Sequence, residues 1–201
     1  TTPFTGTLDG AGYTLRNLTV NRPTTNYQGL FGILDGATVK NLRLENVNVQ
    51  GGQYTGGLAG YVNNSTLENV HLIGEINGGN NTGGLVGSLI GGSNVAYVSS
   101  AATVQGGSST GGLVGYMYTS GTTIYYAYSL GAVQGTGNEV GGLVGTLYIY
   151  GSVVDSYSRA AVSGGDRVGG LVGYQTGSSS QIHRSYSTGV VTGTSTYLGG
   201  L

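Results

Sequence analysis

The chain has 201 residues, which is enough for one domain with a sizeable core, and its net charge is −1 at pH 7. Only 7% of the residues are charged, against about 25% in ordinary globular proteins, so the sequence offers no basic surface for nucleic acid or for an anionic membrane. It contains no cysteine, which excludes disulfides and thiolate metal sites, and no apolar run long enough for membrane insertion.

The first strand pattern stands after a leading segment, residues 1–27, that differs from the rest. The stretch "NLRLENVNV" places Leu42, Leu44, Val47 and Val49 at alternating positions, with a one-residue shift at Glu45–Asn46. Alternation of apolar and polar residues is typical of a strand with one buried face. The pattern therefore predicts a half-buried strand with a bend.

From residue 28 onwards the chain repeats a glycine-rich phrase of the "TGGLVG" type. The leucine of each "GL" marks the repeat at steps of 28, 27, 28, 30, 28 and 30 residues: Leu30, Leu58, Leu85, Leu113, Leu143, Leu171 and Leu201. A second phrase lies between the markers, as in "AYSLGAVQG" from Ala127, "SYSRAAVSG" from Ser156 and "SYSTGVVTG" from Ser185.

The composition and the period of these repeats favour one fold class. Segments rich in Gly, Ser, Thr, Val and Tyr form short strands and turns rather than helices. A propeller blade needs about 40 residues, whereas 27–30 residues suit one coil of a parallel β-helix. We expect residues 1–201 to form a single all-β domain, a β-solenoid of about seven coils, with residues 1–27 as a divergent leading coil and 28–201 as the repeats.

Stacked coils bring equivalent residues into contact, so the alignment of the repeats predicts side-chain ladders. It pairs opposite charges between neighbouring coils in three places: Lys40 with Glu68, Glu139 with Arg167, and Asp155 with Arg184. It also aligns three asparagines that either form an amide ladder or are unconnected turn residues: Asn17, Asn41 and Asn69.

The parity of the second phrase predicts which of its side chains face the core. Small serines point inward and tyrosines point outward as a column, unless a bulge reverses the parity; the serines are Ser129, Ser158 and Ser187, and the tyrosines are Tyr128, Tyr157 and Tyr186. Tyr116 and Tyr174, which follow "GGLVG", are further candidates for a binding surface. Such rings either cover a thin core or contact sugars or another chain.

The sequence lacks the motifs of common catalytic and cofactor sites. Its only lysine is Lys40, so no phosphate-binding G-x-x-x-x-G-K-[ST] loop is present, and neither His71 nor His183 belongs to an H-E-x-x-H motif. The acids fall at different repeat positions, and Asp9 and Asp35 stand in "LDG" turn signals. We therefore expect no enzyme, cofactor or metal; a polysaccharide-active enzyme stays open as a weaker alternative.

Two stretches resemble a known family. "VGGLVGY" from Val168 with "SSSQIHRSYSTGVVTG" resembles the GLUG-motif repeat of bacterial surface proteins, which include filamentous-haemagglutinin-like adhesins and the non-catalytic part of IgA-specific metallopeptidases. The opening, "FTGTLDGAGYTLRNLTV" and "YQGLFGILDGATVKNLRLENVNV", resembles the stretch that leads into such repeats. The resemblance implies a secreted or surface-exposed parallel β-helix that is a segment of a longer polypeptide, and it supplies no catalytic residues.

Two functions follow as expectations. The first is an extracellular stalk or binding surface of an adhesin, whose partner is a glycan or a host or cell-surface protein. The second is a structural protein that associates with itself end to end or laterally, because the final "LGGL" stops partway through a coil. A nucleic acid partner and membrane insertion are not expected.

Overall fold

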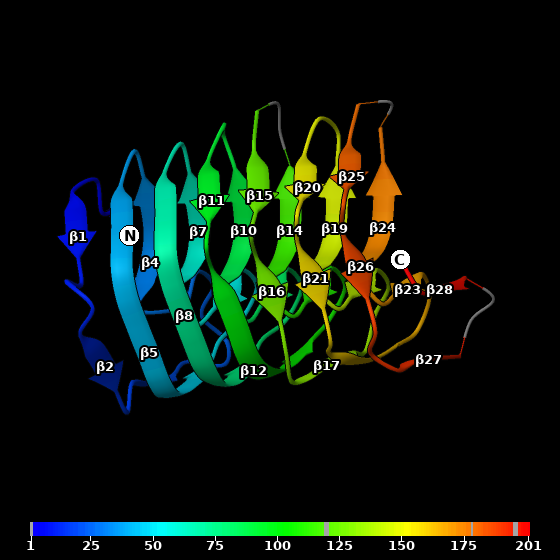
Figure 1. Ribbon diagram of the computed structural model, residues 1–201. Coiled ribbons are helices and arrows are strands. Elements are labelled where there is room, and N and C mark those ends of the chain that lie inside the picture. Colours follow the sequence, from blue (N-terminus) through cyan, green and yellow to red (C-terminus); the bar gives the residue numbers. More distant parts are fainter. Residues whose placement is uncertain (1, 119–120, 178, 195–196) are drawn as a thin grey trace.

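The computed structural model describes residues 2–118, 121–177, 179–194 and 197–201 and shows a rod of stacked coils (Figure 1). All regular elements of the described residues are β-strands, and every strand pairs with its neighbours in parallel. The coils follow one another along the rod from the N-terminal to the C-terminal end. The predicted parallel β-solenoid of about seven coils is confirmed. No helix in the described residues is long and apolar enough to cross a membrane.

Three sheets run along the rod. Sheet 1 has 16 strands, while sheets 2 and 3 have six each. The strands of sheet 2 contain the residues that follow each "GL": β4 (Phe31–Asp35), β7 (Ala59–Asn63), β10 (Val86–Ile90), β14 (Val114–Tyr118), β19 (Val144–Tyr148) and β24 (Val172–Thr176). Those of sheet 3 contain the first glycine of the phrase: β6 (Thr55–Gly56), β9 (Thr82–Gly83), β13 (Thr110–Gly111), β18 (Val140–Gly141), β23 (Val168–Gly169) and β28 (Leu198–Gly199).

Sheet 1 holds the leading coil and the second phrase of each repeat. Its first strands are β1 (Thr7–Asp9), β2 (Thr14–Arg16), β3 (Thr19–Asn21), β5 (Thr38–Gln50), β8 (Thr66–Asn77), β11 (Asn94–Ala96) and β12 (Ser99–Gly106). The strands of the later coils are shorter: β15 (Thr123–Tyr125), β16 (Tyr128–Ser129), β17 (Ala132–Gly135), β20 (Ser152–Val154), β21 (Tyr157–Ser158), β22 (Ala161–Gly164), β25 (Gln181–His183), β26 (Tyr186–Ser187) and β27 (Val191–Gly193).

The bend predicted in "NLRLENVNV" lies in β5. Leu42, Leu44, Val47 and Val49 are buried, and the register with β8 shifts between Leu44 and Val47. Asn46 takes a left-handed backbone conformation there, with φ of 53°. The three short strands of the leading coil, β1 to β3, all pair with β5, so these strands cover its other edge.

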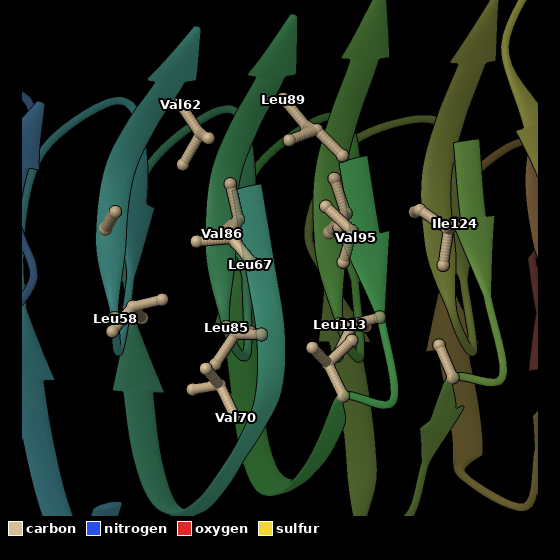
Figure 2. Packing of buried hydrophobic residues seen from close by; sticks show 14 of the residues in the cluster. Leu58, Val62, Leu67, Val70, Leu85, Val86, Leu89, Val95, Leu113 and Ile124 are labelled. Carbon is tan, nitrogen blue, oxygen red and sulfur yellow. The ribbon is translucent and has the colours of Figure 1, made fainter. Parts of the chain in front are cut away.

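Equivalent apolar residues of successive coils form rows through the core. Leu58, Leu85 and Leu113 lie in one such row (Figure 2), and all three are fully buried. The valine after Leu113, Val114, is fully buried as well, so both apolar residues of the phrase fill the core. Burying a leucine side chain contributes about 1.5–3 kcal/mol, and the row repeats that gain in each coil.

The glycines of the phrase are required by close backbone approach. Gly112 is not in the left-handed region, but a Cβ on it would clash with the backbone O of Gly142 and would lie 3.0 Å from Cβ of Ser129 across the core. Ser129 and Ser158 are fully buried, as the parity predicts, and Ser187 is half-buried in the last coil. The core is therefore thin at this level, since only a serine and a glycine separate its two walls.

Candidate functional site

A ladder of outward side chains follows the corner at which the chain bends within sheet 1. One residue of each of the six coils that follow the leading coil occupies this corner in the left-handed conformation, with φ between 44° and 55°: Asn41, Asn69, Tyr97, Tyr126, Asp155 and Arg184. The parallel ladder continues through the corner, because the backbone N–H of Tyr126 donates to Val154 O at 3.3 Å. Equivalent side chains are therefore held beside one another.

Neighbouring side chains pair along this corner ladder, either as like groups or as opposite charges. Asn69 Nδ2 donates to Asn41 Oδ1 at 2.9 Å, and the rings of Tyr97 and Tyr126 stack at 5.0 Å with 12° between their planes. The Arg184 guanidinium donates to both carboxylate oxygens of Asp155, at 2.5 and 2.6 Å. These hydrogen bonds, and then the positive charge of Arg184, lower the pKa of Asp155. The predicted Asp155–Arg184 pair is present.

The predicted position of Asn17 in the asparagine ladder is wrong. Asn17 accepts a hydrogen bond from Asn46 Nδ2 at 2.7 Å, while Asn41 donates to Asp9 Oδ1 at 3.1 Å. The coil is 27–30 residues long, and Asn46 follows Asn17 by 29 residues whereas Asn41 follows it by only 24. The shared "NL" motif misled the alignment, because the bend of β5 provides a second left-handed asparagine.

The predicted ion pair between Lys40 and Glu68 is also wrong. The two residues do lie side by side in the register of β5 and β8. Among the described residues, however, Lys40 Nζ forms its ion pair with Asp9 of the leading coil, at 3.5 Å. A cation between two coils has a neighbour on each side, and Lys40 contacts the carboxylate of the preceding coil rather than that of the following one.

The tyrosines of the second phrase form the outward column that the parity predicts. The rings of Tyr128 and Tyr157 lie 5.2 Å apart and 5° from parallel, and those of Tyr157 and Tyr186 lie 5.3 Å apart and 9° from parallel. The guanidinium carbon of Arg159 lies 5.2 Å from the Tyr157 ring centroid. Because the rings cover one another's faces, the column presents their edges and hydroxyls to solvent.

The tyrosines of the corner ladder, Tyr97 and Tyr126, also contact Tyr125, and Tyr126 precedes Tyr128 of the column by two residues. We name these two groups of tyrosines together the corner cluster. Its six members come from four successive coils: Tyr97, Tyr125, Tyr126, Tyr128, Tyr157 and Tyr186. Tyr97, Tyr126 and Tyr186 are the most exposed, at 51%, 49% and 46%. Within the described chain, no protein group hydrogen-bonds to the phenol oxygen of any of the six. The cluster therefore carries hydroxyls that are available to water or to a ligand.

A second ladder stands one residue before each "TGGLVG"-type phrase, again in the left-handed conformation. Its residues have φ between 51° and 67°: Tyr27, Tyr54, Asn81, Ser109, Glu139 and Arg167. The rings of Tyr27 and Tyr54 stack at 4.8 Å, and Arg167 Nη1 lies 2.9 Å from Glu139 Oε1, as the alignment predicts. The hydroxyls of Ser109 and Thr146 donate to the other carboxylate oxygen, each at 3.0 Å.

The candidate residues Tyr116 and Tyr174 lie beside this second ladder and do not contact each other. Thr146 stands between them in the register of sheet 2. The Tyr116 ring contacts the ring of Tyr148, and partial burial, followed by the neighbouring tyrosines, raises its pKa. The Arg167 guanidinium carbon lies 4.6 Å from the centroid of the Tyr174 ring. A binding role for these two residues stays a prediction.

Tyr97 and Tyr126 are the residues that the sequence analysis missed. Each stands one place before the start of the second phrase, the position that Asp155 and Arg184 occupy in later coils. The same alignment could have found them. They were missed because tyrosine in a left-handed corner is uncommon, so nothing marked the position as a bend.

The acidic residues and His71 are dispersed over the rod. In the residues that the structure describes, no three His, Cys, Asp or Glu side chains gather as a set of metal ligands would. Glu45 pairs with Arg16 at 3.0 Å, on a different coil from Glu139 and Asp155. His71 contacts the Ser99 hydroxyl at 2.8 Å, and burial, followed by the charge of Arg43, lowers its pKa.

Comparison with family models identifies the repeat. The model of the GLUG motif matches residues 164–192, which is one coil from the end of β22 into β27. The chain carries the GLUG motif. Residues 1–74 match a second model, the N-terminal region of the M26 IgA1-specific metallo-endopeptidases. The resemblance expected from the sequence is confirmed at both ends of the chain.

Two individual proteins are similar to this chain. The crystal structure of a candidate immunoglobulin A1 protease from Bacteroides ovatus superposes on 92% of it with a TM-score of 0.75, at 22% sequence identity. Halomucin of Haloquadratum walsbyi is 48% identical over 54 residues, or 26% of this chain. The chain spans 61% of the first protein and 1% of the second. At 22% identity, the structural likeness shows the fold alone.

Proposed function

We propose that this chain is a non-catalytic, extracellular segment of a longer protein and that its corner cluster is a binding surface for a glycan. The observation that carries the proposal is the cluster itself, in which two groups of contacting tyrosines from four coils carry unpartnered hydroxyls. A rigid rod that carries such a binding surface would serve as the stalk or binding surface of an adhesin, which is the role expected from the repeats.

The cluster has the physical properties of a pre-organised contact surface. Tyrosine supplies large contact area at a low cost in side-chain entropy, and stacking on neighbouring coils restrains the rings further. Each phenol can donate and accept a hydrogen bond. With only 7% charged residues in the chain, recognition through ring edges and hydroxyls suits a polyhydroxylated ligand better than a highly charged one.

The extracellular part of the proposal rests on the family matches, and the non-catalytic part rests on the arrangement of the Asp and Glu side chains. The model that matches residues 1–74 describes the N-terminal region of endopeptidases specific for IgA1, an antibody that is met outside the cell. Glu45, Glu139 and Asp155 each form an ion pair with an arginine and stand on different coils. Such carboxylates act as structural charges of the ladders rather than as a pair poised for acid–base chemistry.

A glycan array probed with the purified chain tests the proposal. A variant with Tyr97, Tyr126 and Tyr128 changed to Phe keeps the ring stacks and removes three hydroxyls. Since each hydrogen bond contributes about 1 kcal/mol, we expect the affinity to fall by about 100-fold. The matched control changes Tyr27 and Tyr54, which stack on the second ladder, to Phe and should bind normally.

Other results would overturn this assignment. Equal loss of binding in both variants would show that the corner cluster is not the binding surface. If no glycan binds and the chain instead retains a protein from the surface of cells, the partner is a protein. Light scattering of the same sample tests the structural alternative, because filaments would appear as a mass that grows with concentration.

A further inference from the structure

The chain has no cysteine, so no disulfide can join one coil to the next. Its stacked tyrosines offer a different covalent link. We propose that the corner cluster is a site of oxidative tyrosine coupling, in which a bond between two rings joins successive coils of the rod. The proposal concerns a modification and does not depend on the glycan-binding role.

The geometry brings pairs of reactive rings together at three places. The centroid distances are 5.0 Å for Tyr97 and Tyr126, 5.2 Å for Tyr128 and Tyr157, and 5.3 Å for Tyr157 and Tyr186. The planes of each pair lie within 12° of parallel, so the faces of the two rings lie against each other. The parallel strands hold the rings of Tyr128, Tyr157 and Tyr186 beside one another in the folded chain, so no conformational change is needed to bring them together.

The environment of these rings also suits the chemistry. Loss of one electron from a phenol is accompanied by loss of its proton, which needs an acceptor. The phenol oxygens of the cluster have no protein partner among the described residues, so water can accept the proton. Tyr97, Tyr126 and Tyr186 are about half exposed, which leaves them accessible to an external oxidant.

The reaction balances with a peroxide as the oxidant. A haem peroxidase with hydrogen peroxide removes one electron and one proton from each of two tyrosines. The two radicals form a carbon–carbon bond at the positions beside the hydroxyls, and loss of the ring hydrogens to oxygen restores both aromatic rings. Overall, two tyrosines and one H₂O₂ give one dityrosine and two waters.

Contrast with the isolated tyrosines makes the proposal specific. Tyr13 is 78% exposed, more than any member of the cluster, and it has no ring neighbour in the described part of the chain. If exposure alone governed coupling, Tyr13 would react first and would link different molecules. If stacking governs it, the links form within one molecule, between residues one coil apart.

The test treats the dilute, folded chain with a haem peroxidase and hydrogen peroxide and then digests it with trypsin. Cleavage after Arg159 and Arg184 places Tyr157 and Tyr186 on different peptides, 44–159 and 185–201. We expect these peptides to be joined, with the loss of two hydrogen atoms in mass and with dityrosine fluorescence. A second protease locates the Tyr97–Tyr126 link within the longer peptide.

Two variants serve as matched controls. Tyr157→Phe keeps a ring in the column but removes the central phenol, so the joined peptide should disappear while the Tyr97–Tyr126 link persists and reports that the chain is folded. Tyr13→Phe should leave both intramolecular links unchanged. Absence of the links, or links that occur only between molecules or at Tyr13, would overturn the proposal.

Discussion

Gly115, the last glycine of "TGGLVG", provides the sharpest test of why the repeat is rich in glycine. It is not in the left-handed region, so alanine could adopt its backbone conformation. A Cβ at this position, however, would lie 2.6 Å from Thr82 N, 2.7 Å from Asn81 C and 2.7 Å from Gly87 O. All three are backbone atoms of the preceding coil, so no change of side-chain rotamer can relieve the contact.

The cost of Gly115→Ala follows from that distance. Ordinary contacts begin at 3.4 Å, so the two coils must separate locally by about 0.8 Å. Overpacking of this kind costs about 1–3 kcal/mol, and each ladder hydrogen bond lost between β10 and β14 adds about 1 kcal/mol. The lower entropy of the unfolded alanine chain offsets about 0.4–1 kcal/mol. We expect the free energy of unfolding to fall by about 2–4 kcal/mol.

Guanidinium chloride unfolding, followed by far-UV circular dichroism, measures this change. The matched control is Gly79→Ala, whose Cβ would meet its nearest atom, Gly52 O, at 3.3 Å and which also lies outside the left-handed region. The control should stay within about 1 kcal/mol of the parent chain. If the two variants have the same midpoint, close backbone approach is not what requires glycine in the phrase.

The remaining predictions concern buried hydroxyls and titrating groups. Ser129 Oγ is buried and donates to a carbonyl of the next coil at 2.5 Å, whereas the buried Ser100 Oγ has no partner among the described atoms. Ser129→Ala should therefore lower the free energy of unfolding, measured with denaturant, by about 1 kcal/mol, and Ser100→Ala should leave it unchanged or raise it. The pKa of Asp155 is lowered in the folded chain, so its pair with Arg184 contributes stability above pH 3.8 that is lost as the pH falls through the folded pKa. In Arg184→Gln, the free energy of unfolding should therefore fall less steeply with decreasing pH, as measured by unfolding curves at a series of pH values. The same dependence on pH in the variant and the parent chain would contradict this. The pKa of His71 is lowered by burial, so the unfolded chain binds its proton first and stability should decrease as the pH falls below 6.5; the decrease should be absent in His71→Gln, measured by thermal unfolding on both sides of that pH.

Where sequence reasoning succeeded, it relied on the period of the repeat. Parallel stacking without crossovers makes residues one period apart neighbours, so the Glu139–Arg167 and Asp155–Arg184 pairs could be read from the alignment. Parity placed Ser129 inward and Tyr128 outward, because a strand alternates its faces.

The failures lie where local backbone geometry breaks the period. Because of the left-handed bend at Asn46, Asn17 is hydrogen-bonded to Asn46 and not to Asn41. Lys40 forms its ion pair with Asp9 of the leading coil and not with Glu68. The corners at Tyr97 and Tyr126 carry no glycine or asparagine to mark them, although their φ values are 55° and 52°.

The sequence by itself determined the coil, its length and the direction in which most side chains point, because a repeat of 27–30 residues with fixed glycines and alternating apolar positions permits one kind of stacking. Only the tertiary structure decided that Tyr97 stacks on Tyr126. The corner cluster exists because left-handed residues turn the chain while its backbone ladder continues, and this brings rings from separate coils to about 5 Å of one another. That distance depends on the twist and the spacing of whole sheets, which no single repeat encodes.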